Sequence, residues 1–303
     1  MDAEAWLTQN RAALRQRLQW LQAQPQGIIF TQPSTLQVVA VEKAMSQIRL
    51  WLLEPGSTLV QSRLELDDPL HLVSPYSQAA LLSLAWTDNP HRIYLIGLGG
   101  GRIPLALHHY YPQTVIESTE IDEIVIEVAH NFFGVQPDER LLVAHQDGRA
   151  YLAEREAQLR YDIIFVDAFA GNGPGPFRMA TRDFYQLCQA HLAPGGVVVI
   201  NLLPNDPLRL EKLKTLSSAF EQVYLWLAPG QNTVAFGTTG PLLSQAELIE
   251  RAQALQERHQ FSFSLVARAA EVATDLAKSL PDLEQIAILL DTPSQQSDPG
   301  MSF

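Results

Sequence analysis

The sequence predicts an α/β protein with a mainly parallel sheet that ends in an antiparallel strand, preceded by a small antiparallel β domain and an N-terminal helix. Apolar strands and helices alternate between residues 92 and 201, which is the pattern of a parallel sheet covered on both faces. A hairpin follows at residues 222–237, and a tight hairpin cannot join two parallel strands. The stretch 28–65 has the composition and turns of antiparallel strands instead.

The N-terminal part divides into a helix and a group of strands. Leucines at helical spacing predict a helix over residues 3–24, and Pro25-Gln-Gly27 ends it. Residues rich in β-formers predict strands at 36–42, 47–53 and 58–66, with a turn at 54–57. A helix over 76–86 is expected to follow.

The central and C-terminal parts follow from the same patterns. Parallel strands are expected at 92–96, 115–120, 141–144, 161–166 and 197–201, helices at 103–111 and 122–133, and hairpin strands at 222–227 and 234–237. Helices at 243–259 and 267–280 are expected to close the fold. The predicted domains are an N-terminal helix (1–26), a small β domain (27–75), a nucleotide-binding domain (76–240), C-terminal helices (241–291) and a flexible tail (292–303).

Composition narrows the classes of function. The chain has 303 residues, of which 47% are hydrophobic and 18% charged, and this excludes a disordered chain. Its formal net charge is −12 without any basic run, so neither nucleic acid nor an anionic membrane is an expected partner. The single cysteine, Cys188, excludes a disulfide framework. No long apolar segment and no secretory leader are found, so we expect a cytoplasmic protein.

A glycine-rich segment follows the first parallel strand. Gly97-Leu-Gly-Gly-Gly101 lies between that strand and a helix, where glycine lets the backbone turn sharply and approach a ligand. It does not match the dinucleotide fingerprint, because Arg102 stands at the last glycine position. Glu120 ends the second strand, where an acid accepts hydrogen bonds from ribose hydroxyls. Together with the antiparallel last strand, these features favour an adenosyl-sulfonium ligand over a nicotinamide cofactor.

Two further acids end neighbouring strands. Asp147 follows the third strand and is placed to accept a hydrogen bond from an adenine amino group, or to cap a helix that begins near Arg149. Asp167 ends the fourth strand, and ligands of such sheets bind at the carboxyl ends of the strands. Asp167 is therefore the candidate catalytic residue, which orients an incoming amine or takes its proton. The Gly/Pro segment 171–176 is expected to be a loop and a candidate lid.

In combination, these residues resemble the spermidine synthase superfamily over roughly residues 35 to 240. The matching motifs are Gly97–Gly101, Glu120-Ile-Asp-Glu123, Asp147-Gly148, Tyr161–Asp167 and Leu192–Gly196, with Gln61 and Pro75-Tyr76 upstream. The resemblance implies a Rossmann-like class I methyltransferase fold, a homodimer or higher oligomer, and binding of S-adenosylmethionine, its decarboxylated form or methylthioadenosine. The cofactor-binding candidates are Gly97, Gly99, Gly100, Gly101, Glu120, Ile121, Asp147 and Gly148, and the substrate-binding candidates are Gln61, Tyr76 and Asn201.

The chain departs from the polyamine enzymes of that superfamily at acidic positions. Those enzymes read Gly-Gly-Gly-Asp-Gly in the loop, and their Asp holds the amine of the decarboxylated donor, but Gly100 stands there in this chain. Ala170 replaces the second acid of their Asp-Ser-Ser-Asp motif, and Tyr76-Ser-Gln78 replaces Tyr-His-Glu. Removing the carboxylate partner of a desolvated ammonium costs about 3–5 kcal/mol. Tight polyamine binding is therefore not expected. The segment around Asp167 resembles a spermidine synthase-like branch that includes methyltransferases.

Three functions therefore remain open. The favoured one is a transferase that moves a methyl or aminopropyl group from its donor to a small-molecule or protein amine, with methyl transfer slightly ahead. The alternatives are a genuine polyamine aminopropyltransferase, and an inactive protein that binds S-adenosylmethionine or methylthioadenosine, which Gly100 and Ala170 favour. No metal is expected, because the eight histidines are scattered and adjacent His108 and His109 diverge on a helix.

Overall fold

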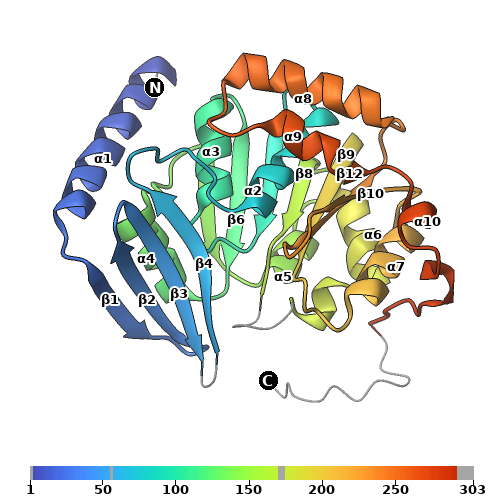
Figure 1. Ribbon diagram of the computed structural model, residues 1–303, viewed down its shortest axis with the longest axis horizontal. Helices are drawn as coiled ribbons and strands as arrows, with labels where there is room; N and C mark the ends of the chain where they lie inside the picture. Colours follow the sequence, from blue (N-terminus) through green and yellow to red (C-terminus); the bar gives the residue numbers. More distant parts are fainter. Residues whose placement is uncertain (1–2, 55–56, 170–174, 292–303) are drawn as a thin grey trace.

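The computed structural model describes residues 3–54, 57–169 and 175–291, which form two sheets (Figure 1). A small antiparallel sheet has the strand order β1-β2-β3-β4, and a large mixed sheet has the order β12-β10-β11-β9-β8-β5-β6-β7. Three predicted features lie outside the described residues: the tip of the turn at 55–56, the segment 170–174 with Ala170, and the tail at 292–303.

The small sheet follows the N-terminal helix and packs on a helix that covers the large sheet. Its elements are α1 (Ala3–Ala23), β1 (Gly27–Pro33), β2 (Val38–Ala44), β3 (Gln47–Glu54) and β4 (Ser57–Glu65). One face of the sheet is apolar, with Val41, Leu50 and Leu64 fully buried against Phe132 and Phe133 of helix α4 (Glu123–Phe133). The sequence analysis did not predict β1, which pairs with β2 at the edge of the sheet.

The large sheet carries its helices on both faces. Its elements are β5 (Arg92–Ile96), α3 (Arg102–Tyr110), β6 (Val115–Glu120), α4 (Glu123–Phe133), β7 (Leu141–His145), α5 (Gly148–Ala153), β8 (Tyr161–Val166), α6 (Arg182–His191), β9 (Leu192–Leu202) and α7 (Arg209–Ala219). Alternate residues of β5 enter different cores, because Ile93 and Leu95 pack on one face while Tyr94 and Ile96 pack on the other. The helix α2 (Pro75–Ala80) continues as a 3₁₀ turn over Leu81–Ala85.

The hairpin β10 (Gln222–Leu227) and β11 (Thr233–Thr238) completes the sheet as predicted. Strand β11 lies between β9 and β10 and is antiparallel to both. The C-terminal elements are α8 (Gln245–His259), α9 (Leu265–Ala270), β12 (Val272–Ala273) and α10 (Leu276–Ser279). The continuous helix expected over 267–280 is therefore wrong, because Val272 pairs with Trp226 of β10 and interrupts it. Within the described ranges, no helix is both long and apolar enough to cross a membrane.

Candidate active site

The glycine loop lies at the carboxyl end of β5 and joins it to α3. Gly97, Gly99 and Gly101 all have positive φ angles of 94°, 54° and 62°, a conformation that L side chains rarely adopt. A Cβ atom on Gly97 would overlap the backbone carbonyl of Asp167. The loop therefore approaches the end of β8 so closely that only glycine fits, and it brings the predicted nucleoside site beside the predicted catalytic residue.

Glu120 ends β6 and is wrapped by backbone donors. Its Oε2 accepts the N–H groups of Leu98 and Gly99 at 3.1 and 3.3 Å, and its Oε1 accepts those of Ile121 and Asp122 at 2.9 and 3.2 Å. Burial raises the pKa of this carboxyl, and the four backbone hydrogen bonds oppose the rise. Glu120 thus fixes the glycine loop, and the side chain of Ile121 beside it is exposed.

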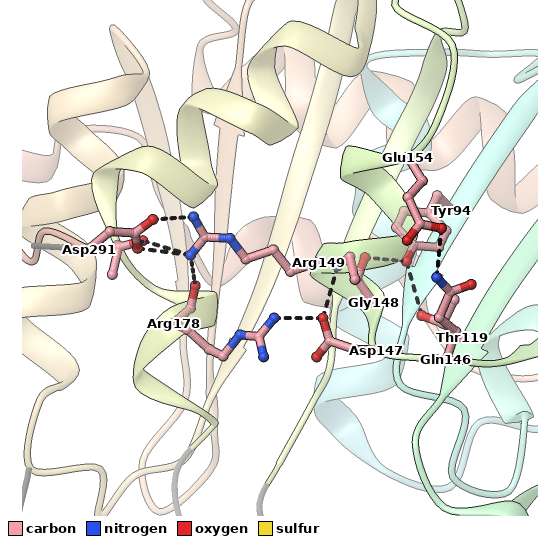
Figure 2. A network of polar contacts seen from close by, with 11 residues as sticks. Tyr94, Thr119, Gln146, Asp147, Gly148, Arg149, Glu154, Arg178 and Asp291 are labelled. Atoms are coloured by element: carbon pink, nitrogen blue, oxygen red, sulfur yellow. Dashed lines mark hydrogen bonds and ion pairs between the residues drawn. The ribbon is translucent and has the colours of Figure 1, made fainter. Parts of the chain in front are cut away.

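Asp147 caps a helix and also pairs with an arginine. Its Oδ1 accepts the N–H of Ala150 at 2.8 Å and so caps α5, and the same oxygen pairs with Nη2 of Arg178 at 2.8 Å. Figure 2 shows Arg178 reaching this carboxylate from the segment that follows β8. Neighbouring Gly148 packs so closely on Ile96 that a Cβ atom would overlap that side chain. The capping role is observed, and the adenine-binding role stays a prediction.

A second arginine ties the end of the described chain to this region. Arg149 donates to both carboxylate oxygens of Asp291, and its Nη1 also donates to the backbone carbonyl of Arg178 at 2.7 Å (Figure 2). The hydroxyl of Thr181 donates to Asp291 at 2.7 Å. The sequence analysis did not identify this group, because Asp291 lies 142 residues from its partner Arg149.

Asp167 lies at the end of β8 within a chain of hydrogen bonds. Nδ2 of Asn201 on β9 donates to its Oδ1 at 2.7 Å, and the Tyr76 hydroxyl on α2 donates to its Oδ2 at 3.4 Å. Asn232 in turn donates to Oδ1 of Asn201 at 2.8 Å and fixes that amide. The structure therefore brings together Asp167, Tyr76 and Asn201, three candidates that lie far apart in the sequence.

Burial and hydrogen bonding shift the pKa of Asp167 in opposite directions. Burial raises its pKa, the hydrogen bonds from Asn201 and Tyr76 lower it, and the nearby charge of Glu120 raises it further. Burial also raises the pKa of Tyr76 well above its ordinary value, and the Asp167 carboxylate adds to that rise. Both shifts agree with the observed hydrogen bond, in which the Tyr76 hydroxyl donates and the Asp167 carboxylate accepts.

The small sheet contributes a strand to the same region. Gln61, a candidate substrate-binding residue, is the extra residue at an irregularity of the β3–β4 register, where Leu50 pairs with Ser62 and Trp51 with Val60. The Oγ of the next residue, Ser62, accepts the backbone N–H of Gly100 at 2.9 Å. The glycine loop is thus held from outside by β4, a contact that the sequence analysis did not predict.

A small cavity adjoins the chain neighbours of Asp167 and strand β9. It is lined by Val166, Ala168, Gly175, Pro176, Met179, Ala180, Tyr185, Ile200, Asn201, Leu202 and Lys212. The buried hydroxyl of Tyr185 has no hydrogen-bond partner among the described residues. Within the part of the chain that the structure describes, no three His, Cys, Asp or Glu side chains lie together as metal ligands would. The absence of a metal from the site stays a prediction.

Comparison with known proteins assigns the family. The spermine/spermidine synthase domain matches residues 78–227. A polyamine aminopropyltransferase of Chromobacterium violaceum is 32% identical over 213 residues, which cover 69% of this chain and 80% of that protein. The chain belongs to the spermine/spermidine synthase family. The resemblance predicted from the motifs is thereby confirmed.

The similar family members differ in activity. The polyamine aminopropyltransferase of Vibrio vulnificus is 33% identical over 184 residues, 60% of this chain and 61% of that protein. The human eEF1A lysine and N-terminal methyltransferase is 31% identical over 209 residues, 62% of this chain and 30% of that protein. The matched region therefore spans less than two thirds of the length of these two relatives.

Solved structures confirm the fold. Human Methyltransferase-like protein 13, solved in complex with SAH, has a TM-score of 0.57 and 29% identity, covering 69% of this chain and 98% of that chain. A probable spermidine synthase from Corynebacterium glutamicum has a TM-score of 0.70 and 19% identity, and the match covers 91% of this chain and 100% of that chain. The predicted fold class, with its antiparallel strand and preceding small sheet, is the fold of this family.

Proposed function

We propose that this spermidine synthase-like transferase uses S-adenosylmethionine and moves its methyl group to an amine. The observation that carries the proposal is the closure of the space at Gly100. A Cβ atom there would lie 2.7 Å from Cβ of Ser62 and 2.8 Å from Cδ1 of Phe133. The position where the polyamine enzymes hold an aspartate for the donor amine is therefore filled by neighbouring side chains.

This closure favours the ordinary donor over the decarboxylated one. S-Adenosylmethionine carries a carboxylate on the carbon that bears its amine, and an acid at position 100 would repel that carboxylate. The Gly100 N–H is already bonded to Ser62, so the loop is stable without the acid. A glycine that is packed by its neighbours supports a change of donor.

Asp167 supplies the chemistry on the acceptor side. A protonated amine is held by this carboxylate and loses its proton to it or to water. The nitrogen lone pair then forms the new C–N bond, while the C–S bond breaks and its electron pair stays on sulfur. Because the sulfonium is already activated, the protein contributes mainly by orientation and by excluding water. The name of the human relative, a lysine and N-terminal methyltransferase, supports a protein amine as acceptor.

Aminopropyl transfer is the second candidate, and the two bacterial relatives named as polyamine aminopropyltransferases favour it. Isothermal titration of the purified protein with S-adenosylmethionine, its decarboxylated form and methylthioadenosine separates the candidates. We expect the ordinary donor to bind more tightly than the decarboxylated one. The opposite order would refute the argument from Gly100 and restore aminopropyl transfer.

Turnover then separates an enzyme from a binding protein. Radiolabelled methyl donor is incubated with putrescine, and in parallel with peptides that carry a free α-amine or lysine. Transfer that disappears in Asp167→Asn, while donor binding is retained, is the expected result. Donor binding without transfer to any of these amines would favour the inactive binding protein.

A further inference from the structure

Asn232 lies at the end of the tight turn between β10 and β11, outside the motifs of the sequence analysis. The turn has Pro229 and Gly230 at its centre, and the N–H of Gln231 donates to the carbonyl of Ala228 at 3.0 Å. Gly230 has a φ of 70°, which glycine adopts readily. The turn therefore fixes the position of Asn232, directly before β11.

The register of the large sheet places Asn232 next to the predicted transfer centre. Val234 of β11 pairs with Asn201 of β9. Nδ2 of Asn232 donates to Oδ1 of Asn201 at 2.8 Å, and Nδ2 of Asn201 donates to Oδ1 of Asp167 at 2.7 Å. Asn232 thus reaches Asp167 through a single intervening amide.

The two amides can donate in only one direction. An ionised carboxylate accepts hydrogen bonds and donates none, so Asn201 must present its Nδ2 to Asp167. Its Oδ1 then faces away from the carboxylate and needs a donor, which Asn232 supplies. If the Asn201 amide were turned over, its Oδ1 would point at the carboxylate and both hydrogen bonds would be lost. Asn232 therefore stabilises the one orientation of Asn201 that holds Asp167.

The other groups that act on Asp167 come from different elements. Burial raises the pKa of Asp167, and the charge of Glu120 on β6 raises it further. Tyr76 on α2 donates to Oδ2 at the longer distance of 3.4 Å, and Arg63 on β4 favours the ionised form of Tyr76. The shorter hydrogen bond, from Asn201, lowers the pKa of Asp167. It therefore favours the ionised carboxylate, the form that binds an ammonium and accepts its proton.

We propose that Asn232 is a positioning residue for group transfer, which holds the Asn201 amide and through it orients the Asp167 carboxylate toward the acceptor amine. The inference rests on the proposed function, because that function gives Asp167 an amine to bind. Asn232 acts through Asn201 and touches neither the donor nor the acceptor. The hairpin that completes the sheet thereby has a part in the site as well as in the fold.

The first test follows Asp167 in the protein without any substrate. Aspartate is labelled with ¹³C at its carboxyl carbon, the signal of Asp167 is assigned from its loss in Asp167→Asn, and the signal is titrated with pH by NMR. We expect Asn232→Ala to raise the pKa of Asp167, because the Asn201 amide is no longer held. Asn232→Asp keeps the shape of the side chain but removes its donor and adds a negative charge, so the pKa should rise further.

A double variant shows whether the effect passes through Asn201. Asn201→Ala alone should raise the pKa of Asp167 at least as much as Asn232→Ala does. Added to Asn201→Ala, the change Asn232→Ala should have no further effect, since the amide through which it acts is already gone. Gln231→Ala is the matched control, because Gln231 is an exposed residue of the same turn and should leave the pKa unchanged.

The second test measures transfer from S-adenosylmethionine to putrescine and to the peptides with a free α-amine or lysine. Asn232→Ala should lower kcat/KM about 2- to 10-fold at neutral pH, as for loss of one neutral hydrogen bond. The acidic limb of its pH profile should move to higher pH, because the ionised carboxylate is the active form. The Kd of S-adenosylhomocysteine should not change, and Gln231→Ala should match the unaltered protein.

An unchanged pKa of Asp167 in both Asn232→Ala and Asn232→Asp would overturn the role of Asn232. An effect of Asn232→Ala that is equally large with and without Asn201 would also overturn it, and either result leaves the proposed function intact. Absence of transfer by the unaltered protein to all of these amines would instead refute the proposed function. The role of Asn232 in transfer would then fall with it, whatever the titration of Asp167 shows.

Discussion

Lys212 and Asp206 form a buried ion pair, and its disruption should produce a large loss of stability. Nζ of Lys212 lies 2.8 Å from Oδ2 of Asp206, and the two side chains are only 3% and 1% exposed. Nζ also donates to the backbone carbonyl of Gly175 at 3.0 Å. Lys212→Met keeps most of the aliphatic volume but leaves a buried carboxylate without its cation. We expect the free energy of unfolding to fall by about 3–5 kcal/mol.

The assay is unfolding in urea at neutral pH, followed by circular dichroism, with an exposed pair as the control. Lys214 pairs with Glu284 at 2.7 Å, but the Glu284 side chain is 89% exposed. Lys214→Met should therefore change the free energy of unfolding by only about 0–1 kcal/mol. Adding Asp206→Asn to Lys212→Met removes the uncompensated charge, so part of the lost stability should return.

The comparison between the two lysines decides the outcome. Losses of equal size in Lys212→Met and Lys214→Met would refute the reasoning, because burial would then make no difference to the value of the pair. A double variant no more stable than Lys212→Met would also contradict it, since the cost is assigned to the carboxylate left behind. A large loss in Lys212→Met alone, partly reversed by Asp206→Asn, is the expected pattern.

Three other predictions concern the site. Gly97→Ala forces a Cβ atom onto the Asp167 backbone at a φ of 94°, so its melting temperature should fall further than that of Gly230→Ala, where φ is 70° and the space is open; equal shifts would contradict this. Asn201→Ala removes a hydrogen bond that lowers the pKa of Asp167. Since the ionised carboxylate accepts the proton, the acidic limb of the kcat/KM profile should move to higher pH. An unmoved limb would disprove the assignment of Asp167 as the proton acceptor. Glu120→Gln should raise the Kd of methylthioadenosine about 10- to 100-fold, and unchanged affinity would exclude a ribose contact.

Sequence patterns predicted the elements whose burial is regular. Strands β5 and β8 are short, mainly apolar runs, and α4 has an Asp cap and an apolar stripe. Edge strand β1 escaped prediction because its residues, Gly-Ile-Ile-Phe-Thr-Gln-Pro, show no alternation and end in proline. The helix expected over 267–280 fails for a different reason. A two-residue pairing with β10 interrupts it, and such tertiary pairing overrides local propensity.

The candidate site divides in the same way. Glu120 and Asp167 could be predicted because each follows a recognisable strand, and the carboxyl ends of parallel strands meet at one edge. The residues that contact the site from other elements could not be predicted. The contact between Ser62 and Gly100 spans 38 residues, and that between Arg178 and Asp147 spans 31. No local pattern encodes which side chain meets another across such distances.

The ion pair of Arg149 and Asp291 has a consequence for the order in which the protein is made. The glycine loop, Glu120 and Asp147 all precede residue 150. The ion pair beside Asp147, however, needs Asp291, which lies 142 positions after its partner Arg149. A ribosome must add nearly half of the chain after the predicted nucleoside-binding residues before that ion pair can form. Contacts of long sequence separation form late in folding. A nascent chain released before residue 291 would carry every residue of the predicted nucleoside site and lack the contact that steadies it.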